Sequence, residues 1–179
     1  IGSSAAVSVA LTKALNKLLD LRLASKAIID YSRQIHNRSQ DSHGSGFDVI
    51  ASFMKERALS CQLYGHESYK HEEIKLPEGI KIFAVVNNAC SQTSQMINRY
   101  EAAKKKYKDY FSNHAPKMKS ELDRLHDSIL RNDSSSMMNS LTRYNKLLVE
   151  MDTKFNIGVF DHHHDLINLA KDHDVFYKP

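Results

Sequence analysis

The segment 44–49, with the sequence Gly-Ser-Gly-Phe-Asp-Val, joins a turn of small residues to an apolar run. Two glycines around a serine suit a turn with unusual backbone angles or a close approach to a ligand. A helix beginning after this turn would hold Asp48 in its first turn, where backbone N–H groups and the helix dipole favour an ionised carboxylate. Asp48 is therefore either a helix cap or a carboxylate held toward a bound phosphate group.

A second candidate site lies at the start of the sequence, where residues 1–6 read Ile-Gly-Ser-Ser-Ala-Ala. Gly2 would let the backbone approach a phosphate, and the N–H groups and hydroxyls that follow it would point at the anion. Ser3 or Ser4 could cap the helix and also reach a phosphate or its Mg²⁺. A plain N-cap is the commoner outcome for such a pattern.

A third candidate site follows the segment 80–86, Ile-Lys-Ile-Phe-Ala-Val-Val, which has the pattern of a buried strand. Ser91, Gln92 and Thr93 come shortly after it and open a long helical pattern. Hydroxyl residues in the first turn of a helix, directly after a buried strand, form a ready anion site. Capping alone would explain one of these residues and not the whole set.

The segment 161–165, Asp-His-His-His-Asp, suggests a metal site because histidine and carboxylate are zinc ligands. Adjacent histidines, however, point in different directions on a helix. Only the pairs Asp161–His164 and Asp161–Asp165 have a spacing that would let two ligands share one ion. We therefore disfavour a metal site at residues 162–164 and assign these histidines no role.

Helices and a sheet must position these sites. Helical patterns cover residues 3–19, 23–37, 47–55 and 92–151, with breaks near 114–116 and 131–134, and a last helix lies around 166–170. Strand patterns cover residues 58–64, 69–75, 80–86 and 175–177. The sequence therefore predicts an α+β fold in which a partial sheet carries helices on one side. In the second helix the expected apolar side consists of Ala24, Ala27, Ile28, Tyr31 and Ile35.

The composition fits a globular protein that needs no disulfide or metal to fold. Of 179 residues 41% are hydrophobic and 26% are charged, so one domain, or a large piece of one, can bury a core. Cys61 and Cys90 have no metal-like spacing, and we interpret them as free thiols in a reducing compartment, the cytoplasm. No apolar run reaches the roughly 18–20 residues that span a bilayer, and we expect no signal peptide.

The net charge of +4 is concentrated in residues 99–131, which hold nine Lys or Arg and five acidic residues. A solvated helix face is the usual explanation for such a region. A nucleic-acid surface is a second explanation, although few aromatic residues are interleaved with the bases. A site for a phosphorylated small molecule is a third.

Together, in this order, the three candidate sites resemble the GHMP small-molecule kinases, and within them most closely the phosphomevalonate kinases. Residues 1–6 resemble the end of the ATP-phosphate motif Pro-x-x-x-Gly-Leu-Gly-Ser-Ser-Ala, with Ile1 in place of Leu. Residues 44–49 are similar to the segment that carries the catalytic aspartate of the family. Ser91-Gln92-Thr93 resembles the acceptor-site segment Gly-Ser-Gln-Thr, with Cys90 in place of glycine. The resemblance covers essentially the whole chain.

The resemblance implies a GHMP-kinase-like fold with a ribosomal protein S5 domain 2-like N-terminal part and a helical, ferredoxin-like C-terminal part. We expect residues 1–86 to belong to the ATP-binding N-terminal domain and residues 87–179 to the mostly helical C-terminal domain. Against the family pattern, the sequence begins inside the ATP motif and ends before a third, glycine-rich motif. We therefore expect a central part of a kinase that is not catalytically competent alone.

The implied reaction transfers the γ-phosphoryl group of ATP, with Mg²⁺, to the phosphate of 5-phosphomevalonate, giving 5-diphosphomevalonate for isoprenoid precursor synthesis. Such a transfer depends on positioning and charge neutralisation. The resemblance gives Asp48 the catalytic role and gives Ser4 a contact with Mg²⁺. Contacts with the ATP phosphates are implied for Gly2, Ser3 and Ser4, and contacts with the acceptor for Ser45, Gly46, Ser91, Gln92 and Thr93. We expect a monomer or homodimer whose partner is the phosphorylated acceptor, with no nucleic acid and no membrane.

Two other interpretations remain open. In a mevalonate kinase or another alcohol- or sugar-accepting member, Asp48 would act on a hydroxyl, and residues 91–93 would be simple caps. In a non-catalytic helical module, the basic region 99–131 would bind a protein or nucleic acid, and ATP would not bind. Steep salt dependence of nucleic-acid binding would support this last interpretation.

Overall fold

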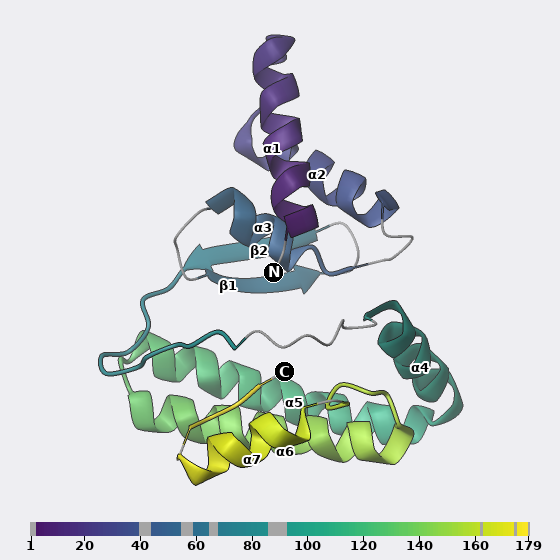
Figure 1. Ribbon diagram of the computed structural model, residues 1–179, viewed down its shortest axis with the longest axis vertical. Coiled ribbons are helices and arrows are strands. Elements are labelled where there is room, and N and C mark those ends of the chain that lie inside the picture. The colour runs from purple at the N-terminus through teal and green to yellow at the C-terminus, as the bar shows by residue number, and fades with distance from the viewer. Residues whose placement is uncertain are drawn as a thin grey trace. The chain divides into compact units, whose positions relative to one another are not determined.

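The computed structural model describes residues 3–39, 44–54, 59–64, 68–85, 93–161, 163–173 and 175–178. The chain forms two compact units, Ile1–Lys75 and Leu76–Pro179 (Figure 1). The first unit contains helices α1 (Ser3–Leu18), α2 (Ser25–Ser39) and α3 (Phe47–Met54) and strands β1 (Leu59–Tyr64) and β2 (Ser68–Glu73). The second contains helices α4 (Thr93–Lys106), α5 (Lys108–Leu130), α6 (Ser134–Phe155) and α7 (His164–Asp172). The described residues are thus mostly helical.

Helix α1 buries its small residues and exposes its large apolar ones. Ala5 and Val9 pack with Val49 of α3 in a buried cluster, against which the half-buried Phe53 also lies. The hydroxyls of Ser8 and Thr12 lie on the same buried side and donate to carbonyls one turn earlier, so they need no outside partner. These small side chains let α1 approach α3 closely. The stripe of large residues, Val7, Leu11, Leu15 and Leu18, is exposed.

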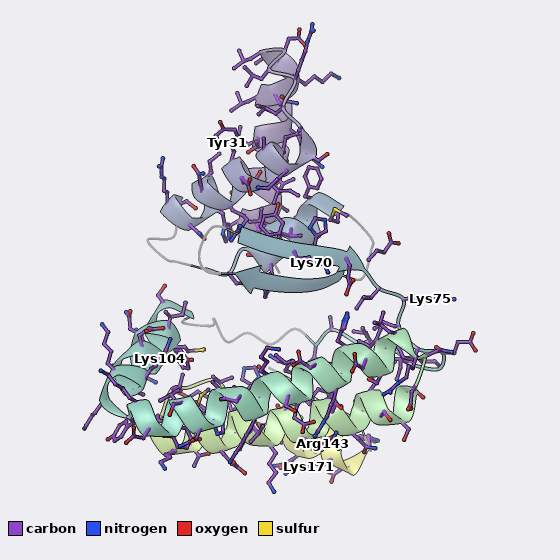
Figure 2. All side chains as sticks on the ribbon, turned by 180° about the vertical axis from the view of Figure 1, so that it is seen from behind. Tyr31, Lys70, Lys75, Lys104, Arg143 and Lys171 are labelled. Carbon is purple, nitrogen blue, oxygen red and sulfur yellow. The ribbon has the colours of Figure 1, made fainter. Side chains whose placement is uncertain are left out.

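The buried face of α2 differs from the predicted one. Tyr31 and Ile35, expected on the apolar side, are exposed, and Figure 2 shows Tyr31 on the outside of its helix. The buried residues are Ile28, Ile29, Ser32, Arg33 and His36. Only Ile28 belongs to both sets. The helix is therefore rotated so that two ionisable side chains face the interior of the first unit. There Arg33 contacts the turn before α3, and His36 contacts Ser4 and Asp48.

The first unit has a single described sheet, the antiparallel pair β1–β2, with Leu59 opposite Glu73 and Tyr64 opposite Ser68. The two strand predictions for this region are confirmed. The segment 80–86, which had the clearest strand pattern, was predicted wrongly for residues 80–85, which the structure describes as irregular. A strand needs a hydrogen-bonded neighbour, and this segment has none among the described residues. Its Phe83 side chain is 76% exposed.

In the second unit, α5 and α6 lie side by side and are joined by a tight turn (Figure 1). Asn132 takes a positive φ of 56°, and the side chain of Asp133 caps α6 by accepting the Ser136 amide at 2.9 Å. The predicted break at residues 131–134 is therefore confirmed. The predicted break at Pro116 is wrong, because α5 continues through it. The helical segment is interrupted instead at Tyr107, between α4 and α5.

The core of the second unit joins α4, α5, α6 and the loop after α6. Phe111, Leu148, Met151, Ile157 and Phe160 are buried in one cluster, and Ile167 of α7 packs against it. The buried Asp152 holds this loop: its carboxylate accepts the amides of residues 158, 159 and 160 at 2.7, 3.0 and 3.0 Å. The short helix predicted around 166–170 is confirmed as α7, whereas residues 175–177 are not a strand. None of the helices in the described ranges has the length and apolarity that crossing a membrane requires.

Candidate functional site

Ser4, His36 and Asp48 come together in the first unit. The Ser4 hydroxyl lies 3.1 Å from Nε2 of His36, and a carboxylate oxygen of Asp48 lies 3.5 Å from the same nitrogen. The three residues belong to α1, α2 and α3, so one imidazole nitrogen connects three helices. The structure thus brings together Ser4 and Asp48, which the sequence analysis had placed in separate motifs.

The helices explain why this meeting point suits an anion. Ser4 and Asp48 are each the second residue of their helix, so the starts of α1 and α3 lie next to each other. At the start of a helix the first backbone N–H groups lack a carbonyl partner within the helix, and the positive end of the helix dipole lies there. In α3 the amides of Phe47, Val49 and Ile50 bond to Ser45 Oγ, Asp48 Oδ1 and the Gly46 carbonyl, so its main contribution to an anion site is the dipole. Two such ends side by side favour a phosphate group or another strong anion.

Burial divides the three side chains into a surface pair and a buried support. The Asp48 side chain is 46% exposed and that of His36 is 7% exposed, while Ser4 is exposed. A ligand can therefore reach the hydroxyl and the carboxylate, whereas the imidazole stays behind them. At 3.5 Å the contact between His36 and Asp48 is electrostatic rather than a short hydrogen bond. The other ring nitrogen of His36, Nδ1, is buried without a hydrogen-bond partner.

The turn before Asp48 is shaped by Gly46 and by the buried Arg33 of α2. Gly46 has a φ of +73°, and its carbonyl accepts the amide of Ile50, the first backbone bond of α3. A Cβ on Gly46 would lie 2.5 Å from Nε of Arg33. Arg33 donates from Nη2 to the carbonyl of Ser45 at 3.2 Å, and its guanidinium carbon lies 5.0 Å from the centre of the Tyr69 ring of β2. The arginine therefore fixes the backbone of the segment that carries Asp48.

The remaining predicted site residues are described in part or not at all. Gly2, Ser91 and Gln92 lie outside the described residues. The backbone of Ser3 begins α1 and that of Thr93 begins α4, as predicted from their hydroxyl-rich motifs. The Ser45 hydroxyl accepts the Phe47 amide at 3.4 Å, so it also supports the turn. Ser45 and Gly46 thus have structural contacts, and their contacts with an acceptor stay a prediction.

The histidine segment near the C-terminus has a local role where it is described. Nδ1 of His163 lies 2.7 Å from the hydroxyl of Tyr177, which joins residues 163 and 177 of the second unit. His162 lies outside the described residues. In the part of the chain that the structure describes, no three His, Cys, Asp or Glu side chains are grouped so that they could hold a metal ion.

Sequence reasoning missed His36 and Arg33. Both lie on the buried face of α2, where they are 5% and 7% exposed. Their spacing of three places them on the same side of the helix, and this spacing was the available signal. It was hidden because the stronger apolar pattern of the helix included residues 31 and 35, which are exposed.

A comparison with known protein families matches the part of the chain that contains the first three helices. Residues 1–56 match the family described as GHMP kinases N terminal domain. The search of curated proteins gave no match, and neither did the search of solved structures. The matched residues include α1, α2 and α3, and with them Ser4, His36 and Asp48. The match covers 56 of the 179 residues and supports, for this part of the chain, the GHMP kinase superfamily and a GHMP-type kinase in general.

Proposed function

We propose that this protein is part of an ATP-dependent kinase that phosphorylates 5-phosphomevalonate to 5-diphosphomevalonate. The observation that carries the proposal is the shared contact of Ser4 and Asp48 with Nε2 of His36. A phosphoryl-transfer site needs anion-binding backbone groups and a carboxylate next to each other. The adjacent starts of α1 and α3 offer both. The Gly-Ser-Gly turn and the Ser-Gln-Thr segment support the choice of acceptor, because together they resemble the phosphomevalonate kinases.

The donor set of the site fits Mg²⁺. The hydroxyl of Ser4 and the carboxylate of Asp48 are hard oxygen ligands, and Mg²⁺ is usually held by one or two carboxylates together with substrate phosphates and water. The imidazole of His36 is a poor ligand for this ion, and its burial keeps it behind the two oxygens. When bound, ATP and Mg²⁺ would supply the phosphoryl group and neutralise its charge.

Each residue then has a distinct task. Ser4 and the first turn of α1 bind the ATP phosphates. Asp48 orients the metal and the reacting phosphates; it has no nucleophile to generate, because the attacking phosphate oxygen is already ionised. His36 is a positioning residue that holds the Ser4 hydroxyl and the Asp48 carboxylate next to each other. The γ-phosphorus–oxygen bond to ADP breaks as the acceptor oxygen bonds to phosphorus.

The proposal includes the α+β fold of the family and the division into domains at residues 86 and 87. The β1–β2 hairpin would supply two strands of the N-terminal domain. The remaining strands of that fold, the cytoplasmic location and a monomeric or dimeric state are expectations that belong to the proposal.

The test is ADP release by the full-length protein with 5-phosphomevalonate, mevalonate and sugars as acceptors. We expect 5-phosphomevalonate to give the highest kcat/KM. A higher kcat/KM for mevalonate or a sugar would contradict the proposed acceptor but would still agree with a GHMP-type kinase. Absence of ADP release with every acceptor, together with absence of ATP binding, would contradict the kinase itself.

Variants separate the tasks of the site residues. Asp48→Ala should lower kcat by about 10²-fold or more while the circular dichroism stays unchanged, and turnover within about tenfold of the wild type would refute its catalytic role. The matched control is Asp30→Asn, a partly exposed carboxylate that pairs with Lys26 on α2. His36→Gln should lower kcat more than it changes the KM for ATP. Its control is His114→Gln, which removes a buried imidazole of the second unit, bonded to the Leu147 carbonyl.

A further inference from the structure

A pocket of about 380 Å³ opens between α4 and α5 in the second unit. Only Tyr107 separates the two helices, so the chain changes direction there and the helices diverge. The α5 wall carries small side chains at Ser112 and Ala115, which leave the space unfilled. The volume falls in the range of about 300–1,000 Å³ that is usual for small-molecule sites.

The floor of this pocket is aromatic. Phe111 is buried and lies edge-to-face with Tyr100, with ring centres 5.4 Å apart. Both residues line the pocket, together with the methyl group of Ala115. An aromatic body in this space would contact the Tyr100 and Phe111 rings, and such contacts are favourable beyond the area that they bury.

The rim of the pocket is positively charged. Lys104, Lys105 and Lys108 line it, with Glu101 as the acidic lining residue, and Figure 2 shows Lys104 projecting from α4. Lys104 lies 3.8 Å from Glu101 and is paired with it. Among the described residues Lys105 and Lys108 have no carboxylate partner. Two uncompensated ammonium groups therefore stand at the edge of an aromatic hollow, and lysine is a common phosphate-binding residue.

We propose that this pocket binds a small aromatic phosphate, with the ring against Phe111 and Tyr100 and the phosphate between Lys105 and Lys108. The site requires no phosphoryl transfer and uses none of the residues Ser4, His36 or Asp48. The proposed pocket therefore goes beyond the kinase function, and its test does not depend on whether the kinase function is correct. A solvated helix face would explain the lysines, but it would not explain a hollow with an aromatic floor beside them.

The test is a titration of the whole chain with phenyl phosphate, followed by NMR and calorimetry. We expect saturable one-to-one binding, with shifts at Phe111 and Tyr100 and weakening as salt is added. Inorganic phosphate and benzyl alcohol carry the two halves of the probe separately, and each should bind at least about tenfold more weakly. Equal binding of inorganic phosphate, or no saturable binding of phenyl phosphate, would overturn the proposal.

Two variants with matched controls localise the binding. Ala115→Leu fills the hollow and keeps the lysines; its control is Ala102→Leu, an exposed position of α4 outside the lining. The double change Lys105→Gln, Lys108→Gln keeps the hollow; its control is Lys117→Gln, Lys119→Gln, with the same loss of charge further along α5. Each pocket variant should raise Kd at least about tenfold and each control less than about twofold. Unchanged Kd in either pocket variant overturns the assignment, and the lysine pair decides alone if Ala115→Leu fails to fold.

Discussion

Replacing Gly46 by alanine tests whether Arg33 and the turn before Asp48 form one packed unit. Gly46 has a φ of +73°, and a Cβ there would lie 2.5 Å from Arg33 Nε and 3.0 Å from its Cγ. Arg33 is buried at 7% exposure, so it has little room to move. The substitution should therefore strain the backbone and displace the arginine at the same time.

The expected cost is the sum of these two effects. An L-residue in the left-handed region costs about 1–2 kcal/mol. Displacing the guanidinium also breaks its bond to the Ser45 carbonyl, which at 3.2 Å is a charged hydrogen bond worth about 1.5–3 kcal/mol. Gly46→Ala should thus lower the free energy of unfolding of the first unit by about 2.5–5 kcal/mol. In an Arg33→Ala background only the backbone cost of about 1–2 kcal/mol should remain.

The assay must report the first unit separately. Urea unfolding followed by the methyl NMR signals of Val9 and Val49 meets this need, because both residues are buried in its core cluster. Gly79→Ala is the matched control: Gly79 has a φ of +82°, and nothing lies within 4 Å of its added Cβ. That change should cost only the backbone strain, read from the second unit. The reasoning is refuted if Gly46→Ala costs no more than Gly79→Ala, or costs the same with and without Arg33.

Three further changes probe the second unit. Asp152→Ala should lower the free energy of unfolding of the second unit by about 3–5 kcal/mol, because the amides of residues 158–160 lose a buried charged acceptor. Urea unfolding followed at the Leu148 methyl groups measures this loss. A loss below about 1 kcal/mol would contradict the role of the carboxylate. Glu121→Gln should cost about 1–2 kcal/mol in the same assay, since Glu121 accepts from Arg124 and Arg143 but both arginines are partly screened by water. Acidification should uncap α6: the hydroxyl and then the backbone amide of Ser136 hold the pKa of Asp133 below its ordinary value of 3.8. The stabilisation from this cap is complete above the unfolded-state pKa and is lost as the pH falls through the folded-state pKa. The amide proton shift of Ser136 should therefore stay constant above about pH 5 and move only in stronger acid, whereas a change centred near pH 6 would contradict this cap.

Local patterns predicted the helices well, because capping and helical periodicity are properties of neighbouring residues. The start of α3 follows from the glycine turn, and the start of α6 follows from Asp133. The interruption between α4 and α5 was misplaced. Proline disfavours a helix interior, yet Pro116 lies inside α5, which packs against α6 over much of its length. Tertiary packing outweighed the local preference there.

The segment 80–85 shows where a strand pattern is insufficient. Alternating and continuous apolar residues indicate a surface that would suit a sheet, but they do not supply the neighbouring strand. The hairpin β1–β2 was predictable because its two strands are close in sequence and pair with each other.

The candidate site was predictable only residue by residue. Ser4 and Asp48 belong to motifs with a local physical reason, a serine and a carboxylate at helix starts. Their meeting depends on how α2 is rotated, and the apolar pattern of α2 favoured the wrong face. The place of His36 in the candidate site could therefore be recognised only from the packed helices, in which its ring nitrogen contacts both Ser4 and Asp48.

The shared nitrogen of His36 makes the two surface residues thermodynamically linked. Nε2 carries at most one proton, so it can donate fully to the Ser4 hydroxyl or to the Asp48 carboxylate, but not to both. In the proposed site, a cation bound to the carboxylate would change which oxygen receives that proton, and with it the orientation of the hydroxyl. By reciprocity, a phosphate bound at Ser4 would then alter the affinity of Asp48 for the cation by the same factor. Two proposed binding events on different helices would thus share one coupling free energy, located in a side chain that neither ligand touches.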